Sequence, residues 1–443
     1  MNPPSIPQRW LHRFAMLTAL ATLGLIGLGG LVTSHEAGMS VPDWPTSYGY
    51  NMFALPFKFW SGGVFYEHTH RLWASSVGLL VVVLARWLGG RAACRPLLIV
   101  GMVEILAGIG VFALRPDLKG TGHFLTGIGG VVLLAGMVWV KNAPANRTLV
   151  KLGWTVFWLV QFQGLLGGLR VVLFKDQIGI LHAALAQIFF VLTCVIAMFT
   201  SRWWWNRGNI QHSMDASSVE PLSVECSMLN VECFRTLHRL FLFTTMLIFL
   251  QLLIAATMRH QHAGLAISDF PLAHGQLWPD TSAEAVLRYN QQRTEISGVN
   301  PITAFQIQLQ MAHRIMAGLI LLLVAGCAVK ARNVGAPGTD PARMDLNRAE
   351  TVLGAPLRRL TFCWLGLIFL QACLGAATVL WNKPADLATG HVLVGALSLA
   401  TGALLCIISA RRLTTTGRAA RGGPAGEFFL REEISFAART SAP

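Results

Sequence analysis

The chain has 443 residues and a formal net charge of +14; 53% of its residues are hydrophobic and only 13% are charged. This composition is too apolar for an ordinary soluble domain. It also excludes a nucleic-acid-binding face, because no soluble segment combines basic residues with the aromatic and polar side chains that read bases. We therefore predict an all-α polytopic membrane protein whose positive charge contacts anionic membrane lipid.

Apolar runs of about 20 residues, the length that crosses the hydrocarbon core of a bilayer as a helix, recur along the chain. The first follows QRWLHRF and continues into SHEAGMSVPDW without a small-residue cleavage site, so we expect a retained helix and not a signal peptide. In chain order we predict ten membrane-spanning helices, near residues 12–34, 66–90, 96–114, 120–140, 152–174, 178–200, 238–258, 306–329, 359–381 and 387–410.

The basic residues give the expected orientation. With the N-terminus in the cytoplasm, most Lys and Arg residues fall in cytoplasmic segments, as the positive-inside rule requires. The C-terminus then lies in the cytoplasm as well. Because the chain carries no transit peptide, we expect a bacterial cell inner (plasma) membrane.

One unusual loop sequence occurs twice. AGMSVPDWP at residues 37–45 returns as AGLAISDFP at 263–271, and both are rich in turn formers. In the same register, LHRFAMLTAL at 11–20 aligns with LHRLFLFTTM at 237–246. We predict two pseudo-symmetric four-helix bundles, the first of which carries an extra helix hairpin at about 95–141.

The domain boundaries follow from this repeat. We expect an N-terminal bundle over 1–200, a cytoplasmic linker without regular structure over 201–236, a C-terminal bundle over 237–410 and a disordered cytoplasmic tail over 411–443. Cys226 and Cys233 in the linker could bind a metal, but their spacing fits no standard site and the cytoplasm is reducing.

Five histidines share one depth in the membrane, within one or two turns of the outer end of an inward-going helix. Polar side chains there are costly and usually face a bundle interior. Zinc or a di-iron centre would need carboxylate or thiolate partners, such as a Glu-x-x-His pair from each of two helices, and only the segment EHTH supplies a Glu-x-x-His. Imidazoles on facing helices suit the two axial positions of a haem. The five are His70, His123, His182, His313 and His391.

Neighbouring residues leave two readings open. Glycines in GLLGG (164–168) and LGA (374–376) would let a haem approach the backbone, or would serve close helix packing. Arg71 and Arg314, each directly after a histidine, would pair with haem propionates or anchor helix ends.

Several motifs together resemble the haem A synthase family, membrane enzymes that oxidise haem O to haem A for cytochrome oxidase. They are spread in a specific order over both halves: GGLVTSHEAGMSVPDWP, EHTHRLWASSVGLL, QGLLGGLRV followed by HAALAQIFF, RHQHAGLAISDFPLAHG, QMAHRIMAG, and LGAATVLWNKPADLATGHVLVGAL. The resemblance implies that His70 and His182 hold the iron of the substrate haem O, and that His313 and His391 hold a haem b cofactor. It also implies a quinone or other membrane electron acceptor, and haem O synthase as a partner.

The resemblance further assigns the catalytic carboxylate to Glu67. The i, i+3 spacing places Glu67 and His70 on one helix face, where a carboxylate could take a proton during oxidation of a ring methyl. The alternative is that Glu67 stabilises the positive end of the helix dipole at the N-terminus.

The chain departs from the family in two ways. It lacks the cysteine pair that many bacterial members carry in the external loops, and it has the extra hairpin. Glu104 and His123 in that hairpin repeat the spacing of Gln163 and His182, so His123 is the rival ligand to His182. Glu104 lies in mid-span and needs a partner that the sequence does not identify.

Two other function classes compete with the enzyme. A dihaem b electron-transfer protein would use the same four histidines, and only Glu67 distinguishes the two. A transporter is a third class, but both halves have the same orientation and no broken helix is evident. In either haem protein, we expect each D-[WF]-P turn to cover the exposed edge of the haem in its own half.

Overall fold

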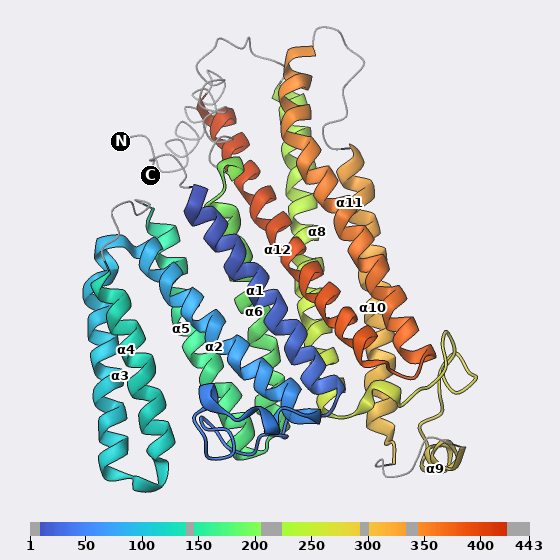
Figure 1. The fold of residues 1–443 in the computed structure, drawn as a ribbon. Coiled ribbons are helices and arrows are strands. Elements are labelled where there is room, and N and C mark those ends of the chain that lie inside the picture. Colours follow the sequence, from blue (N-terminus) through green and yellow to red (C-terminus); the bar gives the residue numbers. More distant parts are fainter. Residues whose placement is uncertain (1–8, 139–145, 205–223, 293–300, 334–343, 423–443) are drawn as a thin grey trace, which may run out of the picture. The chain divides into compact units, whose positions relative to one another are not determined.

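The computed structural model describes residues 9–138, 146–204, 224–292, 301–333 and 344–422 (Figure 1). The described residues form helices and short 3-10 turns, and no strand occurs among them. The prediction of an all-α chain is therefore confirmed. The helices are α1 (Arg9–Ser34), α2 (Gly62–Gly89), α3 (Cys94–Leu114), α4 (Lys119–Met137), α5 (Arg147–Leu173), α6 (Asp176–Phe199), α8 (Val224–His260), α9 (Ala283–Gln292), α10 (Ala304–Asn333), α11 (Met344–Leu380) and α12 (Ala385–Gly422).

Nine stretches of the described chain are long and apolar enough to cross a membrane. The longest, Gly62–Leu114, contains α2 and α3, which the 3-10 turn Gly90–Ala93 joins. The ten expected spans therefore correspond to these nine stretches, with the second and third spans continuous. The chain is a multi-pass membrane protein.

Three helices extend further than we expected. α8 begins at Val224, inside the segment 201–236 that was expected to lack regular structure; α11 begins at Met344; and α12 continues to Gly422, into the expected disordered tail 411–443. VECSMLNVECFRTL and ARRLTTTGRAA contain no proline, and each adjoins an apolar helix that can propagate into it at little cost. Residues 205–223 and 423–443 of these segments lie outside the described part of the chain, as do the side chains of Cys226 and Cys233.

The chain divides into two compact units. Unit 1 comprises residues 1–205, 251–315 and 370–397, and unit 2 comprises residues 206–250, 316–369 and 398–443. Helices α8, α10, α11 and α12 each contribute residues to both units. This division does not follow the two sequence halves, whose independence as domains stays a prediction.

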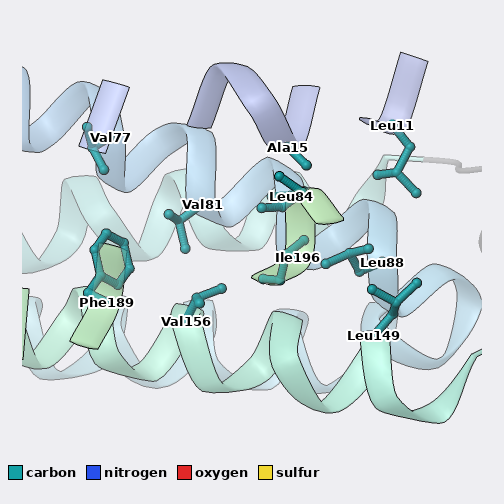
Figure 2. Close-up of a cluster of buried hydrophobic side chains, with 11 residues drawn as sticks. Leu11, Ala15, Val77, Val81, Leu84, Leu88, Leu149, Val156, Phe189 and Ile196 are labelled. Carbon is teal, nitrogen blue, oxygen red and sulfur yellow. The ribbon is translucent and has the colours of Figure 1, made fainter. Parts of the chain in front are cut away.

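A four-helix core occupies the first half of unit 1. α1 packs against α2 and α6, and α5 packs against the same two helices. Every one of the four helices buries aliphatic or aromatic side chains in a single cluster, which Figure 2 shows in close-up. Its members include Leu11 and Ala15 of α1, Val77, Val81, Leu84 and Leu88 of α2, Leu149 and Val156 of α5, and Phe189 and Ile196 of α6.

The extra hairpin consists of α3 and α4, which lie side by side in Figure 1 and are in close contact along their length. Glycines make this approach possible, because a side chain at Gly101 or Gly129 would collide with the backbone of the other helix. A second cluster attaches the hairpin to the four-helix core through Val82 of α2 and Phe157 of α5, which pack against Leu97 and Val132.

Unit 2 has a core of its own around Trp364. Its indole Nε1 donates a hydrogen bond to Ser398 O at 2.8 Å, and its ring packs edge-on against Phe241 at 6.0 Å between centroids. Gly402 leaves space for the Trp364 ring. His238, at the start of the repeated segment LHRLFLFTTM, shares a 2.8 Å hydrogen bond with the Ser409 hydroxyl.

Two glycines of α3 test the packing of the hairpin against a matched control. A Cβ atom at Gly108 would lie 2.7 Å from both Gly122 O and Thr126 N, whereas one at Gly110 would meet nothing within 4 Å. We expect Gly108→Val to destabilise the hairpin by about 1–3 kcal/mol through overpacking, and Gly110→Val to have little effect. Thermal denaturation and limited proteolysis in detergent would measure this; equal loss in both variants would contradict the packing.

Candidate functional site

The first loop, residues 35–61, is folded around Asp43. Its carboxylate accepts hydrogen bonds from Tyr48 N at 2.6 Å and Gly49 N at 2.9 Å. Those two residues have positive φ angles of 52° and 77°, and the Trp44–Pro45 peptide bond is cis. The carboxylate therefore binds two N–H groups that a tight reversal leaves without carbonyl partners.

The second loop, described over residues 261–292 and 301–303, repeats this geometry around Asp269. Asp269 accepts from His274 N at 2.8 Å and Gly275 N at 2.9 Å, whose φ angles are 50° and 76°. Phe270–Pro271 is the second cis peptide bond. The repeat seen in the sequence is thus a repeat of backbone conformation, including residues that the two loops do not share.

Hydrogen bonds to these carboxylates set their acidity. Burial raises the pKa of Asp43, but the hydrogen bonds from Thr46, Gly49 and Tyr48 outweigh that effect and hold the pKa below its ordinary value of 3.8. Burial likewise raises the pKa of Asp269, and the bonds from Gly275 and His274 bring the net value below 3.8. Both carboxylates are therefore ionised at neutral pH.

An arginine binds each loop to the helix below it. Arg71 of α2 donates to Asp43 O at 2.7 Å, Thr46 O at 3.1 Å and Val41 O at 2.8 Å. The Arg71 guanidinium thus binds several loop carbonyls at once, in an arrangement that we call the arginine lock. In the second half, the corresponding bonds run from Arg314 of α10 to Asp269 O at 2.8 Å and Leu272 O at 2.9 Å.

The two halves differ at the residue three positions before the histidine. In the first half, Glu67 accepts from Val41 N at 2.8 Å and from the Arg71 guanidinium at 2.7 Å. In the second half, Gln310 accepts from Ile267 N at 2.7 Å and donates to Ile267 O at 3.1 Å. Both side chains are buried, 4% and 2% exposed, and hold the same point of the loop. One of them is an acid and the other an amide.

The histidines that follow these residues face the bundle interior. His313 of α10 and His391 of α12 have ring centroids 6.3 Å apart, with their planes inclined by 62°. A metal–imidazole bond is about 2 Å long and a ring centroid lies about 1 Å behind the nitrogen, so two imidazoles on one ion have centroids about 6 Å apart. The spacing of this pair fits one iron atom between the rings.

The first-half pair has the matching surroundings. His70 of α2 lies against Gly29 of α1, where an added Cβ would be 3.2 Å from its ring, and His182 of α6 lies against Gly167 of α5 at 3.5 Å. His391 lies against Gly375 in the same way, at 3.1 Å. Glycines in the two sequence motifs therefore admit an imidazole to the helix surface, which is a third role beside the two we considered.

All four histidines share one feature of hydrogen bonding. The Nδ1 atom of each is buried and has no hydrogen-bond partner among the described residues. At two of the four, a glutamine of a neighbouring helix donates a hydrogen bond to the backbone carbonyl of the histidine. Gln163 donates to His182 O at 3.1 Å, and Gln251 donates to His313 O at 2.9 Å. Since buried polar atoms are otherwise nearly always paired, these imidazoles are suited to bind a ligand; at His391 the amide of Gln371 lies 3.3 Å from Nε2. Among the described residues, no group of three or more His, Cys, Asp and Glu side chains could hold a metal ion.

The rival histidine and the mid-span acid of the hairpin are placed differently. His123 of α4 is exposed and contacts Phe112 of α3, with ring centroids 5.1 Å apart. Glu104 of α3 accepts a 2.7 Å hydrogen bond from the amide of Gln161 on α5. The partner that the sequence did not identify is thus an amide of the four-helix core, and it ties the hairpin to that core.

The structure adds residues that our reading of the sequence missed. Gln310 and Gln163 begin the motifs QMAHRIMAG and QGLLGGLRV, but we assigned them no role, and Gln251 lies in no motif that we singled out. Gln310 could have been found by aligning EHTHR with QMAHR, since the two segments place Glu67 and Gln310 in one register. Arg259 of α8 was also missed: it donates to Gly30 O at 2.8 Å and to the Thr33 and Ser34 hydroxyls of α1, joining the second half to the first.

The chain matches a known protein family. The family model COX15-CtaA, described as cytochrome oxidase assembly protein, matches residues 122–402, which is more than half of the chain. The matched range contains His182, His313 and His391 and begins after Glu67 and His70. A comparison with individual curated proteins found no match.

The aspartate contacts predict how each loop responds to substitution. Asp43→Asn removes the charge and one acceptor, so amide hydrogen exchange at Tyr48 and Gly49 should become about 10- to 100-fold faster while the second loop is unchanged. Asp269→Asn should give the converse result at His274 and Gly275. Hydrogen exchange with mass detection measures both; acceleration in both loops by either variant would contradict independent folding.

The loops should also respond to acid. Because the folded-state pKa of each aspartate lies below 3.8, its contribution is complete above the unfolded value of 3.8 and is lost as the pH falls through the folded value. Exchange protection of the loop amides, corrected for intrinsic rates, should therefore be constant from about pH 5 to 8 and should decrease only below about pH 4. A decrease centred near pH 6 would implicate a histidine instead.

Proposed function

The chain belongs to the COX15-CtaA family of cytochrome oxidase assembly proteins, and we propose that it is a haem A synthase. In this proposal it oxidises a ring methyl of haem O to a formyl group, for use in cytochrome oxidase. The iron of the substrate haem O is held by His70 and His182. A haem b cofactor is held by His313 and His391. The enzyme works in the cell inner membrane, with both termini in the cytoplasm.

The observation that supports this function most is the difference between two otherwise matching sites. Each half has the same loop, the same arginine lock and a histidine three residues after the loop-binding side chain. The first half alone has a carboxylate there, because Glu67 is replaced by Gln310 in the second. Two electron-carrying sites would not need this difference, whereas one substrate site and one cofactor site would.

Glu67 would accept protons from the substrate. Two successive hydroxylations, each adding an oxygen atom from water and releasing two electrons and two protons, would convert the methyl to a hydroxymethyl and then to a diol, which loses water to leave the formyl group. Haem b, when bound, carries away the electrons and passes them to a quinone or another membrane acceptor. Glu67 lies one helical turn before His70, and its carboxylate takes the protons released from the methyl carbon. The Arg71 guanidinium holds the carboxylate in place at 2.7 Å.

One observation favours the alternative of a dihaem b electron-transfer protein. Both oxygens of Glu67 already have partners, Val41 N and Arg71, so its contacts are also those of a purely structural residue. In that case haem O synthase would not be a partner, and haem b would occupy both histidine pairs.

Substitution of the carboxylate separates the two functions. Gln310 shows that an amide can hold this loop, so Glu67→Gln should keep the first loop bound while removing the proton acceptor. We expect haem A formation to fall at least about 100-fold and haem content to stay constant. The measurement is chromatography with mass detection of haems extracted from full-length protein made in cells that supply haem O.

Two controls accompany that experiment. Exchange protection of the Val41 amide, which Glu67 binds, should be retained in Glu67→Gln and lost in Glu67→Ala, so that a released loop can be told apart from a lost proton acceptor. Unchanged haem A formation in Glu67→Gln would refute the catalytic role. Haem b alone in the unmodified protein, with haem O available, would establish the electron carrier.

The choice between His182 and His123 has its own test. His182 faces the bundle interior with a buried Nδ1, whereas His123 is exposed on the hairpin. His182→Ala should therefore abolish haem binding in the first half and change the optical spectrum, and His123→Ala should do neither. Haem quantified per protein chain measures both variants; a loss in His123→Ala alone would reverse the assignment.

A further inference from the structure

Four half-buried arginines of unit 1 lie near the two loops, and three of them have hydrogen bonds within the protein. Arg71 and Arg314 form the arginine locks, and Arg259 donates to three oxygens of α1. The fourth, Arg170 of α5, donates its guanidinium N–H groups to none of the described residues. It is half-buried, so this charge has lost much of its water without gaining a partner.

Arg170 is placed beside the first histidine pair. It follows Gly167, which contacts the His182 ring, by one helical turn on the same face of α5. Its charge acts on both His70 and His182. The carboxylates that act on it, Glu67 and Asp176, form no ion pair with it, and Glu67 is already bound to Arg71.

The first loop leaves space for this guanidinium. A Cβ atom at Gly38, the glycine of AGMSVPDWP, would lie 2.8 Å from a terminal nitrogen of Arg170 and 3.3 Å from its central carbon. The second loop repeats the arrangement with another cation, because Gly264 lies against the side-chain carbons of Lys383 at 3.7 and 3.8 Å. In each half, the loop glycine therefore lies against a cationic side chain.

We propose that Arg170 binds a propionate carboxylate of the porphyrin held between His70 and His182. The proposal rests on the function proposed above, and it assigns the anion contact to a residue other than Arg71, whose guanidinium holds the loop. A planar guanidinium with unused N–H groups fits a carboxylate in two-point contact. Bound in this way, the porphyrin is fixed in rotation about the axis through the two imidazoles, which decides the ring methyl that Glu67 meets.

The position in the other half does not supply this contact. Thr378 of α11 follows Gly375 as Arg170 follows Gly167, and its hydroxyl donates to Leu374 O at 2.7 Å. Arg170 therefore acts at the first site alone, and its loss should not change the second.

The test measures binding and needs no turnover. Iron protoporphyrin IX and its dimethyl ester, in which both propionates are neutral, are titrated against the full-length protein in detergent and followed by visible absorbance. A His313→Ala background removes ligation at the second pair, so that the first site is observed alone. We expect the free acid to bind at least about tenfold more tightly than the ester, and Arg170→Gln to abolish that preference.

Two further variants calibrate the result. Arg170→Lys keeps the charge and should retain part of the preference. Lys175→Gln removes the same charge from an exposed residue five positions along the chain and should retain all of it. Esterification changes the ligand and not the protein, so misfolding of a variant cannot imitate its effect.

The outcomes separate this proposal from the one on which it rests. If the Arg170→Gln protein prefers the free acid over the ester as strongly as the protein with Arg170 does, the assignment to Arg170 is wrong and the proposed substrate site stands. If the His313→Ala background binds neither porphyrin, the first pair does not hold the substrate and both proposals fail. Loss of the preference in Arg170→Gln but not in Lys175→Gln establishes the contact.

Discussion

Hydrogen bonds from two arginines to loop carbonyls determine where the candidate site lies. A chain reversal at the end of a membrane helix exposes carbonyl oxygens that little water can reach, and these need donors from the protein. Arg71 and Arg314 supply them, and each directly follows a histidine of the site. The position of the loop and the position of the imidazole are therefore fixed by the same turn of helix. The loop aspartates complete the arrangement by binding the N–H groups of the reversal.

The two halves share their backbone conformation more closely than their side chains. Backbone features are kept even where the side chains differ: the cis peptide bonds, the positive φ angles and the arginine locks recur in both loops. Side chains near the histidine pairs diverge more readily, as Glu67 and Gln310 or Arg170 and Thr378 show. A fold built twice can thus hold two similar ligands and treat them differently, because a hydrogen bond to a loop can be made by either an acid or an amide.

Much of this architecture was predictable because a few signals dominate it. Apolar length identified the helices, and the loop repeat identified the two halves. The histidine depths selected five candidates, the four of the two pairs and His123, and depth alone did not separate His123 from His182. Contacts between uncharged side chains and backbone were not predictable: Gln251 has no charge and lies in no motif, and the spacing that drew attention to Gln163 did not indicate its hydrogen bond to His182 O. Helix ends at Val224 and Gly422 were misplaced because polar residues continue a helix when nothing breaks it.

The hairpin of α3 and α4 has a consequence for movement within the membrane plane. Its second hydrophobic cluster covers Val82 of α2 and Phe157 of α5, and the bond from Gln161 to Glu104 fastens the same seam. A lipid-soluble molecule that diffuses along the bilayer meets the hairpin before it meets the seam between α2 and α5. The hairpin therefore closes the seam between α2 and α5 to lateral approach from the lipid, on one side of the four-helix core.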